Sequence, residues 1–223
     1  TVTALEIAPD GSGYRLKNAL ARKFDVDPAQ ITLGNGSSEI LELVARAFLT
    51  PELEVLFSQH AFAVYPIVTQ AVGATAVVVP ALNFGHDLAA MLHKVNEKTR
   101  LVFIANPNNP TGTLLAQADL QRFIEALPET CICVLDEAYF EFVADRGQDD
   151  SIAWLRKYPN LIITRTFSKA YGLAGLRVGY SFSSPEMADI LNRVRQPFNN
   201  NTLALVAAEA ALEDTEHLQN TLQ

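Results

Sequence analysis

The chain has 223 residues, which is enough for one sizeable hydrophobic core. Its composition, 49% hydrophobic and 19% charged, is typical of a soluble globular protein, and the net charge of -8 disfavours general binding to nucleic acid or anionic membranes. No stretch approaches the roughly 20 apolar residues of a membrane span, so we expect a cytoplasmic protein.

Short apolar and β-branched runs predict strands at residues 53–57, 75–79, 100–105, 130–135, 161–164 and 177–182. The runs are continuous, which is typical of strands buried on both faces. Helical spacing lies between most of them, for example at Ile40, Val44 and Phe48, or at Leu88 and Leu92. Strands that alternate with helices predict an α/β fold with a mainly parallel, doubly wound sheet and helices on both faces. We find no repeat and no Gly/Ser-rich linker, so one domain is expected.

In open sheets of this kind, ligands bind beyond the carboxyl ends of the strands, and the sequence has four polar clusters where such ends are predicted. The first is GNGSSEI, residues 34–40, where two glycines precede a helix predicted to begin near Ser37. Free N–H groups and the positive end of the helix dipole indicate an anion site, to which Ser37 and Ser38 offer amides and hydroxyls. Simple capping of the helix is the alternative.

The second cluster, ANPNNPTGT at residues 105–113, follows the strand predicted at 100–105. Two prolines and a glycine restrict the shape of this loop and leave Asn106, Asn108 and Asn109 as hydrogen-bonding groups. Turn formation alone would explain these residues. A rigid loop can also hold an amide in one direction, as a binding site requires.

The third cluster is VLDEAYF, in which Asp136 ends a strongly apolar strand and Tyr139 follows three residues later. A carboxylate at the end of a buried strand is costly unless it meets a cation, a metal or several hydrogen-bond donors. Capping of the next turn is the alternative to a functional role.

The fourth cluster is TRTFSKAYGLAGLR, residues 164–177, which follows the strand predicted at 161–164. Lys169 lies near the hydroxyls of Thr166 and Ser168, and Arg177 adds a fixed positive charge. A single lysine is ordinarily a solvated surface group. Together, however, the four clusters offer what pyridoxal phosphate needs, namely a lysine for a Schiff base, an acid for the ring nitrogen, donors for the ring oxygen, and a phosphate site.

Several motifs in this chain are similar to those of one enzyme family. NPNNPTG, DEAYFEF and RTFSKAYGLAGLRVGY, in this order and spacing, resemble the fold-type I pyridoxal-phosphate aminotransferases of classes I and II. Within that family, GYRLKNALARKF, LGNGSSEILELVARAF and NRVRQPFNNN are most similar to the histidinol-phosphate aminotransferases. The resemblance covers nearly the whole chain. It implies a transferase of histidine biosynthesis that exchanges an amino group between glutamate and imidazole acetol phosphate.

The resemblance also implies roles for individual residues. Lys169 would bind the cofactor as a Schiff base and then move the substrate proton, while Asp136 would keep the ring nitrogen protonated. Asn109 and Tyr139 would bond the phenolic oxygen of the ring. Phe62, in QHAFAVY, would stack on the ring, with a place in the core as the alternative. The residues implied for the cofactor phosphate are Ser37, Ser38, Thr166, Ser168 and Arg177.

The chain departs from the family pattern in two respects. Ala8 precedes Pro9 where the family usually has a tyrosine that reaches the cofactor phosphate of the neighbouring subunit. Family members also carry an N-terminal arm and a smaller C-terminal domain with the arginine that binds the substrate carboxylate. Residues 1–223 are therefore expected to be the large cofactor-binding domain alone, which would bind pyridoxal phosphate but transaminate poorly or not at all.

Other functions remain open on the sequence alone. The cofactor motifs also suit a pyridoxal-phosphate lyase or decarboxylase of the threonine-phosphate decarboxylase type, another amino-acid aminotransferase, or a non-catalytic cofactor-binding module. The resemblance implies a homodimer with small amino-acid and keto-acid substrates and no nucleic-acid or membrane partner.

No metal site is predicted. Cys131 and Cys133 are expected to be small buried hydrophobic residues rather than a disulfide or a metal pair. The four histidines, His60, His86, His93 and His217, do not have the spacing of a metal pair.

Overall fold

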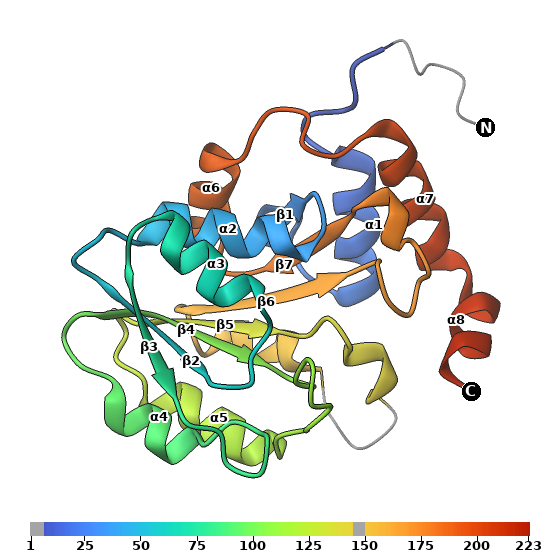
Figure 1. Cartoon of the computed structure of the whole chain (residues 1–223). Helices are drawn as coiled ribbons and strands as arrows, with labels where there is room; N and C mark the ends of the chain where they lie inside the picture. Colours follow the sequence, from blue (N-terminus) through green and yellow to red (C-terminus); the bar gives the residue numbers. More distant parts are fainter. Residues whose placement is uncertain (1–6, 145–149) are drawn as a thin grey trace.

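The computed structural model describes residues 7–144 and 150–223. Within these residues, a seven-stranded sheet runs through the molecule in the order β1-β7-β6-β5-β4-β2-β3 (Figure 1). The pairs from β6 through β3 are parallel, whereas β7 runs antiparallel to both β6 and β1. The strands are β1 Ile31–Gly34, β2 Glu54–Ser58, β3 Thr75–Val79, β4 Thr99–Ala105, β5 Ile132–Asp136, β6 Leu161–Thr166 and β7 Gly179–Phe182.

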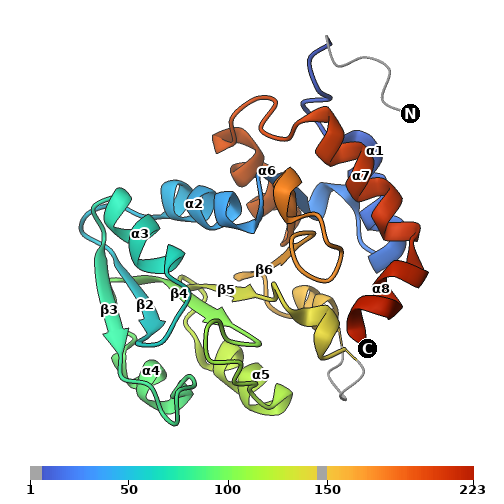
Figure 2. The same cartoon turned by 45° about the vertical axis from the view of Figure 1, so that its right-hand side comes forward.

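Helices cover both faces of the sheet (Figures 1 and 2). One face carries α2, α3 and α6, and its core includes Ile40, Tyr65 and Leu191. The other carries α1, α4, α5 and α7, with a core that includes Leu20 and Phe123. None of the described helices is long and apolar enough to cross a membrane. The α-helices are α1 Tyr14–Phe24, α2 Ser37–Phe48, α3 Val64–Ala71, α4 Leu88–Lys94, α5 Gln117–Ala126, α6 Pro185–Val194, α7 Thr202–Glu213 and α8 Thr215–Leu222, and the short 3-10 helices are η1 Pro28–Gln30, η2 Phe140–Phe142, η3 Ser151–Arg156 and η4 Ala174–Leu176.

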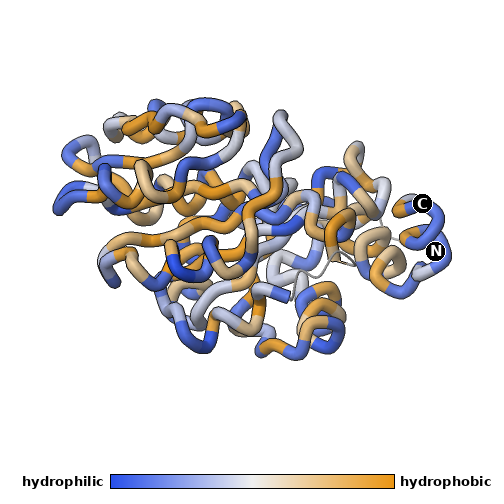
Figure 3. Tube along the Cα trace, turned by 90° about the horizontal axis from the view of Figure 1, so that it is seen from below, coloured by the Kyte–Doolittle hydropathy of each residue, from blue (hydrophilic) through white to orange (hydrophobic). Residues whose placement is uncertain are grey.

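The predicted fold class is confirmed, with three corrections. Hydrophobic segments run through the middle of the molecule (Figure 3), and each predicted strand is present with its ends shifted by a few residues at most. Strand β1 was not predicted, because a four-residue ITLG segment is too short to show a pattern. Strand β7 is antiparallel, and β3 is not buried on both faces, since it is an edge strand in which Val78 is 52% exposed.

The strand register brings distant residues together at one edge of the sheet. Asp136, the last residue of β5, is paired with Ala105 at the end of β4 and with Thr164 in β6. Thr166, at the end of β6, is paired with Gly179 at the start of the antiparallel β7. The carboxyl ends of the three central strands therefore meet at the edge where a ligand is expected.

Candidate active site

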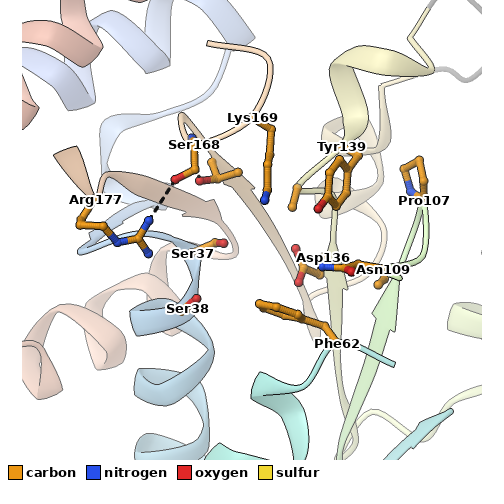
Figure 4. A pocket seen from close by; sticks show the side chains of 13 residues that line it. Ser37, Ser38, Phe62, Pro107, Asn109, Asp136, Tyr139, Ser168, Lys169 and Arg177 are labelled. Atoms are coloured by element: carbon orange, nitrogen blue, oxygen red, sulfur yellow. Dashed lines mark hydrogen bonds between the residues drawn. The ribbon is translucent and has the colours of Figure 1, made fainter. Parts of the chain in front are cut away.

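A cavity opens at this edge of the sheet (Figure 4). All ten side chains that were predicted to bind the cofactor line this cavity, and the role of each one there remains a prediction. Ala105, Pro107 and Ala138 complete the wall. The predicted residues in the lining are Ser37, Ser38, Phe62, Asn109, Asp136, Tyr139, Thr166, Ser168, Lys169 and Arg177.

Asp136 is buried at the floor of the cavity, with only 3% of its surface exposed. Burial raises the pKa of this carboxyl, while hydrogen bonds from Tyr65, Thr164 and the Ala138 N–H, together with the charge of Lys169, act in the opposite direction. Tyr65 Oη donates to Oδ2 at 2.9 Å, and Thr164 Oγ1 donates to Oδ1 at 3.1 Å. The acid therefore depends on donors for its charged form, and a cation placed against it would stabilise that form further.

The sequence did not predict either donor, Tyr65 or Thr164. Tyr65 belongs to α3, 71 residues from Asp136, and it is completely buried with its ring stacked 4.5 Å from that of Phe103. Burial, and next the charge of Asp136, raise the pKa of Tyr65, so its hydroxyl stays protonated and able to donate. Thr164 opens the fourth polar cluster, but no role was predicted for it. Its hydroxyl is aimed at Asp136 because the two residues are register partners in neighbouring strands.

Lys169 lies in the turn that follows β6, and its side chain extends into the cavity toward Asp136 (Figure 4). Its Nζ is 5.2 Å from the centre of the Tyr139 ring. The residues around it in the chain, Phe167 and Ala170, are fully buried, so the backbone that carries the lysine is anchored in the core. The turn is closed by a hydrogen bond from the Gly172 N–H to the Lys169 carbonyl oxygen at 2.9 Å. An exposed lysine on an anchored turn is thus directed into the site rather than spread over the surface.

Another part of the cavity wall gathers a positive charge and hydrogen-bond donors at the start of α2. Helix α2 begins at Ser37 as predicted, and the N–H groups of a first helical turn have no partner inside their helix. The guanidinium of Arg177 lies beside this helix start and donates from Nη1 to Ser168 Oγ at 3.3 Å. Gly36, with φ 77° and ψ 164°, permits this approach, because a Cβ atom there would lie 2.3 Å from Arg177 Nη2. A fixed positive charge, hydroxyls and free amides therefore converge on one point.

The three asparagines of the 105–113 loop do not share one role. Asn109 lines the cavity (Figure 4), whereas the other two hold the loop in place. Asn106 Oδ1 accepts a hydrogen bond from the Leu115 N–H at 2.9 Å. Asn108 Nδ2 donates to the carbonyl oxygen of His60 at 2.7 Å, close to the segment that carries Phe62. Turn formation and ligand binding thus both apply, to different residues.

Several residues named in the sequence analysis lie outside the cavity. Cys131 and Cys133 are buried free thiols, as predicted, and burial raises the pKa of Cys131 to about 12. His86 is buried and its Nε2 lies 2.9 Å from the Ala105 carbonyl oxygen. Across residues 7–144 and 150–223, no cluster of three or more His, Cys, Asp or Glu side chains is arranged to hold a metal ion. Ala8 is exposed and is not among the residues that line the cavity.

The donor set of the cavity fits pyridoxal phosphate. A primary amine for an aldehyde, a buried acid for a ring nitrogen, an amide and a phenol for a ring oxygen, and an anion site lie around one space. Fold and site together are those of a pyridoxal-phosphate enzyme. The chain belongs to the family of class I and II aminotransferases, whose sequence model matches residues 6–223.

The chain is similar over nearly all of its length to several members of this family. It is 60% identical over 221 residues to histidinol-phosphate aminotransferase 2 of Methylococcus capsulatus, covering 96% of this chain and 60% of that protein. It is 54% identical over 222 residues to histidinol-phosphate aminotransferase 1 of Idiomarina loihiensis, covering 100% of this chain and 60% of that protein.

Among solved structures, the histidinol-phosphate aminotransferase of Sinorhizobium meliloti in complex with pyridoxal-5'-phosphate superposes with a TM-score of 0.93 at 35% identity. The match covers 97% of this chain and 59% of that one. The chain therefore spans about three fifths of the length of these relatives.

Proposed function

We propose that the protein is a pyridoxal-phosphate-dependent aminotransferase that converts histidinol phosphate and 2-oxoglutarate to imidazole acetol phosphate and glutamate, in either direction. The observation that carries the proposal is the single cavity in which Lys169, Asp136, Tyr139 and the anion site converge. The names of the relatives at 54% to 60% identity support this substrate pair over another amino acid. They likewise favour amino transfer over decarboxylation.

The residues of the cavity divide into three tasks. When bound, pyridoxal phosphate would supply an aldehyde that reacts with amines and a protonated ring that withdraws electrons from the substrate Cα. Lys169 Nζ would hold the cofactor covalently and, once the substrate amine replaces it, take the proton from Cα. The carboxylate of Asp136 would hold the proton on the ring nitrogen. That positive charge would in turn lower the pKa of Asp136, against the effect of its burial.

The remaining side chains would orient the cofactor. Asn109 and Tyr139 would bond the phenolic oxygen, and Phe62 would stack on the ring. The phosphate would be held by Arg177 and by the amides and hydroxyls at the start of α2 and at the end of β6. These roles are supported by the common lining of the cavity.

We propose further that the protein acts in the cytoplasm as a homodimer, and that residues 1–223 form its cofactor-binding domain. The family resemblance supports the dimer. Small amino-acid and keto-acid substrates are the proposed partners, and the net charge of -8 supports the absence of nucleic-acid and membrane partners.

A single-turnover assay tests the proposed reaction. The chain is loaded with pyridoxal phosphate and mixed with histidinol phosphate, and both the keto product and CO2 are measured. We expect imidazole acetol phosphate at up to one equivalent per bound cofactor, no CO2, and slow continued turnover with 2-oxoglutarate. Asp136→Asn is expected to lose the keto product while it keeps much of the cofactor. CO2 release in place of the keto product would contradict the proposed reaction, and efficient multiple turnover would contradict the expectation that this chain transaminates poorly or not at all.

A further inference from the structure

One motif of the sequence has no place in the function described so far. The segment 195–201, RQPFNNN, joins α6 to α7 and is not among the residues that line the cavity. Two of its three asparagines nevertheless reach the turn that opens α2. Asn200 Nδ2 donates to the Gly34 carbonyl oxygen at 2.8 Å, and Asn199 Nδ2 donates to the Leu33 carbonyl oxygen at 3.1 Å, in both cases across 166 residues of sequence.

A carboxylate and a guanidinium extend these contacts. Asn199 Nδ2 also donates to Glu39 Oε2 at 2.6 Å, and the same oxygen accepts the Asn35 N–H at 2.5 Å. Arg195 Nη1 donates to Asn199 Oδ1 at 2.7 Å, while its Nη2 donates to the Gly11 carbonyl oxygen at 2.8 Å. The asparagine amide is therefore held at both ends.

The result is that three successive residues, from the end of β1 into the turn before α2, are tied through their backbone. The carbonyls of residues 33 and 34 and the N–H of residue 35 all bond to this cluster. Asn200 is 4% exposed, so water competes little for its hydrogen bond. The N–H groups at Ser37 and Ser38, which follow within four residues, are the ones proposed to face the phosphate. A turn with its peptide planes fixed would present them without an ordering cost on binding.

We propose that Asn199 and Asn200, supported by Arg195 and Glu39, are positioning residues that hold the turn 34–38 ready to bind the cofactor phosphate. The inference rests on the proposed function, because that function supplies the phosphate. A cluster that only stabilised the fold would affect every ligand of the cavity equally. A cluster that positions the phosphate turn affects only ligands that carry a phosphate.

Comparison of pyridoxal phosphate with pyridoxal separates these two roles. Both molecules can react with Lys169, but pyridoxal lacks the phosphate. We expect Asn200→Ala and Asn199→Ala each to weaken equilibrium binding of pyridoxal phosphate about tenfold and to change pyridoxal binding less than twofold. The matched control is Asn160→Ala, because Asn160 is also buried, at 8% exposed, and its Nδ2 donates to the Cys131 carbonyl oxygen at 2.7 Å, at the amino ends of β5 and β6 rather than beside the turn. It should leave both affinities unchanged.

A second readout needs no cofactor. In the ligand-free chain, backbone hydrogen exchange over residues 34–39 is expected to rise at least tenfold in Asn199→Ala and Asn200→Ala, and to stay at the wild-type rate in Asn160→Ala. If one asparagine variant does not fold, the other carries both tests. Equal loss of pyridoxal and pyridoxal phosphate, or unchanged exchange over the turn, would overturn the inference. A wild-type chain that binds neither molecule would overturn the proposed function instead. The exchange measurement would still decide whether Asn199 and Asn200 hold the turn.

Discussion

Arg165 is the most deeply buried charge of the described chain, and its removal should have a large effect on stability. Its side chain is 0% exposed and donates from Nε and Nη2 to Glu137 Oε2 at 2.9 and 2.8 Å. Its guanidinium carbon also lies 3.8 Å from the centre of the Phe140 ring. Glu137 has one further donor in the hydroxyl of Ser151, at 2.6 Å. Arg165→Met would therefore leave a buried carboxylate without a cation, at a cost of about 3–5 kcal/mol.

The double variant Arg165→Met with Glu137→Gln removes both charges and should regain most of that loss. Urea unfolding of the wild type, both single variants and the double variant gives the coupling energy, which we expect to be at least about 2 kcal/mol. Asp150→Asn is the matched control, because Asp150 also bonds Arg165 at 2.8 Å but its side chain is 44% exposed, so about 0–1 kcal/mol is expected. A cost below about 1 kcal/mol for Arg165→Met, or strictly additive single effects, would refute this reasoning.

Three further predictions concern the site and its surroundings. Burial raises the pKa of the Glu141 carboxyl from 4.5 to about 7, so the contribution of this group to stability is present below about pH 4.5 and lost as the pH rises through 7. In urea unfolding, Glu141→Gln should therefore be more stable than the wild type by up to about 3 kcal/mol at pH 8 and equally stable at pH 4.5. A difference that is independent of pH would exclude this cause. Tyr65→Phe removes one donor to the Asp136 carboxylate and should lower the free energy of unfolding at pH 8 by about 1.5–3 kcal/mol, whereas an unchanged midpoint would show that this hydrogen bond contributes nothing. Gly36→Ala should cost about 1–3 kcal/mol of stability and weaken pyridoxal-phosphate binding through Arg177, and wild-type affinity in a spectroscopic titration would contradict the proposed phosphate contact.

The sequence was sufficient for the parts of the site that follow strand ends. Asp136 ends one strongly apolar strand and Lys169 lies three residues after the end of the next, and parallel strands bring such positions to one edge of a sheet. Ser37 could be placed because the start of a helix has its own local signature. These are local features, and the structure puts all of them around one cavity.

Partners that come from distant segments were not predictable in this way. Tyr65 and Asp136 are 71 residues apart, and nothing in the spacing of α3 distinguishes a tyrosine that bonds an acid from one that only fills the core. The sequence indicated no direction for β7 within the mainly parallel sheet, because an apolar run carries no information on orientation. Arg165 did have a signal, since a charge inside an apolar strand must find a partner. The strand register was needed to identify that partner as Glu137.

The central claim is that Lys169 is the residue that binds the cofactor. The most direct measurement is reduction of the chain with borohydride in the presence of pyridoxal phosphate, followed by digestion and mass spectrometry of the peptides. We expect one phosphopyridoxyl group per chain, on the peptide that contains Lys169. In Lys169→Ala, we expect both that label and the visible absorption band to be lost. Stoichiometric labelling of a different lysine in the wild type, or an unchanged absorption band in the variant, would contradict the account.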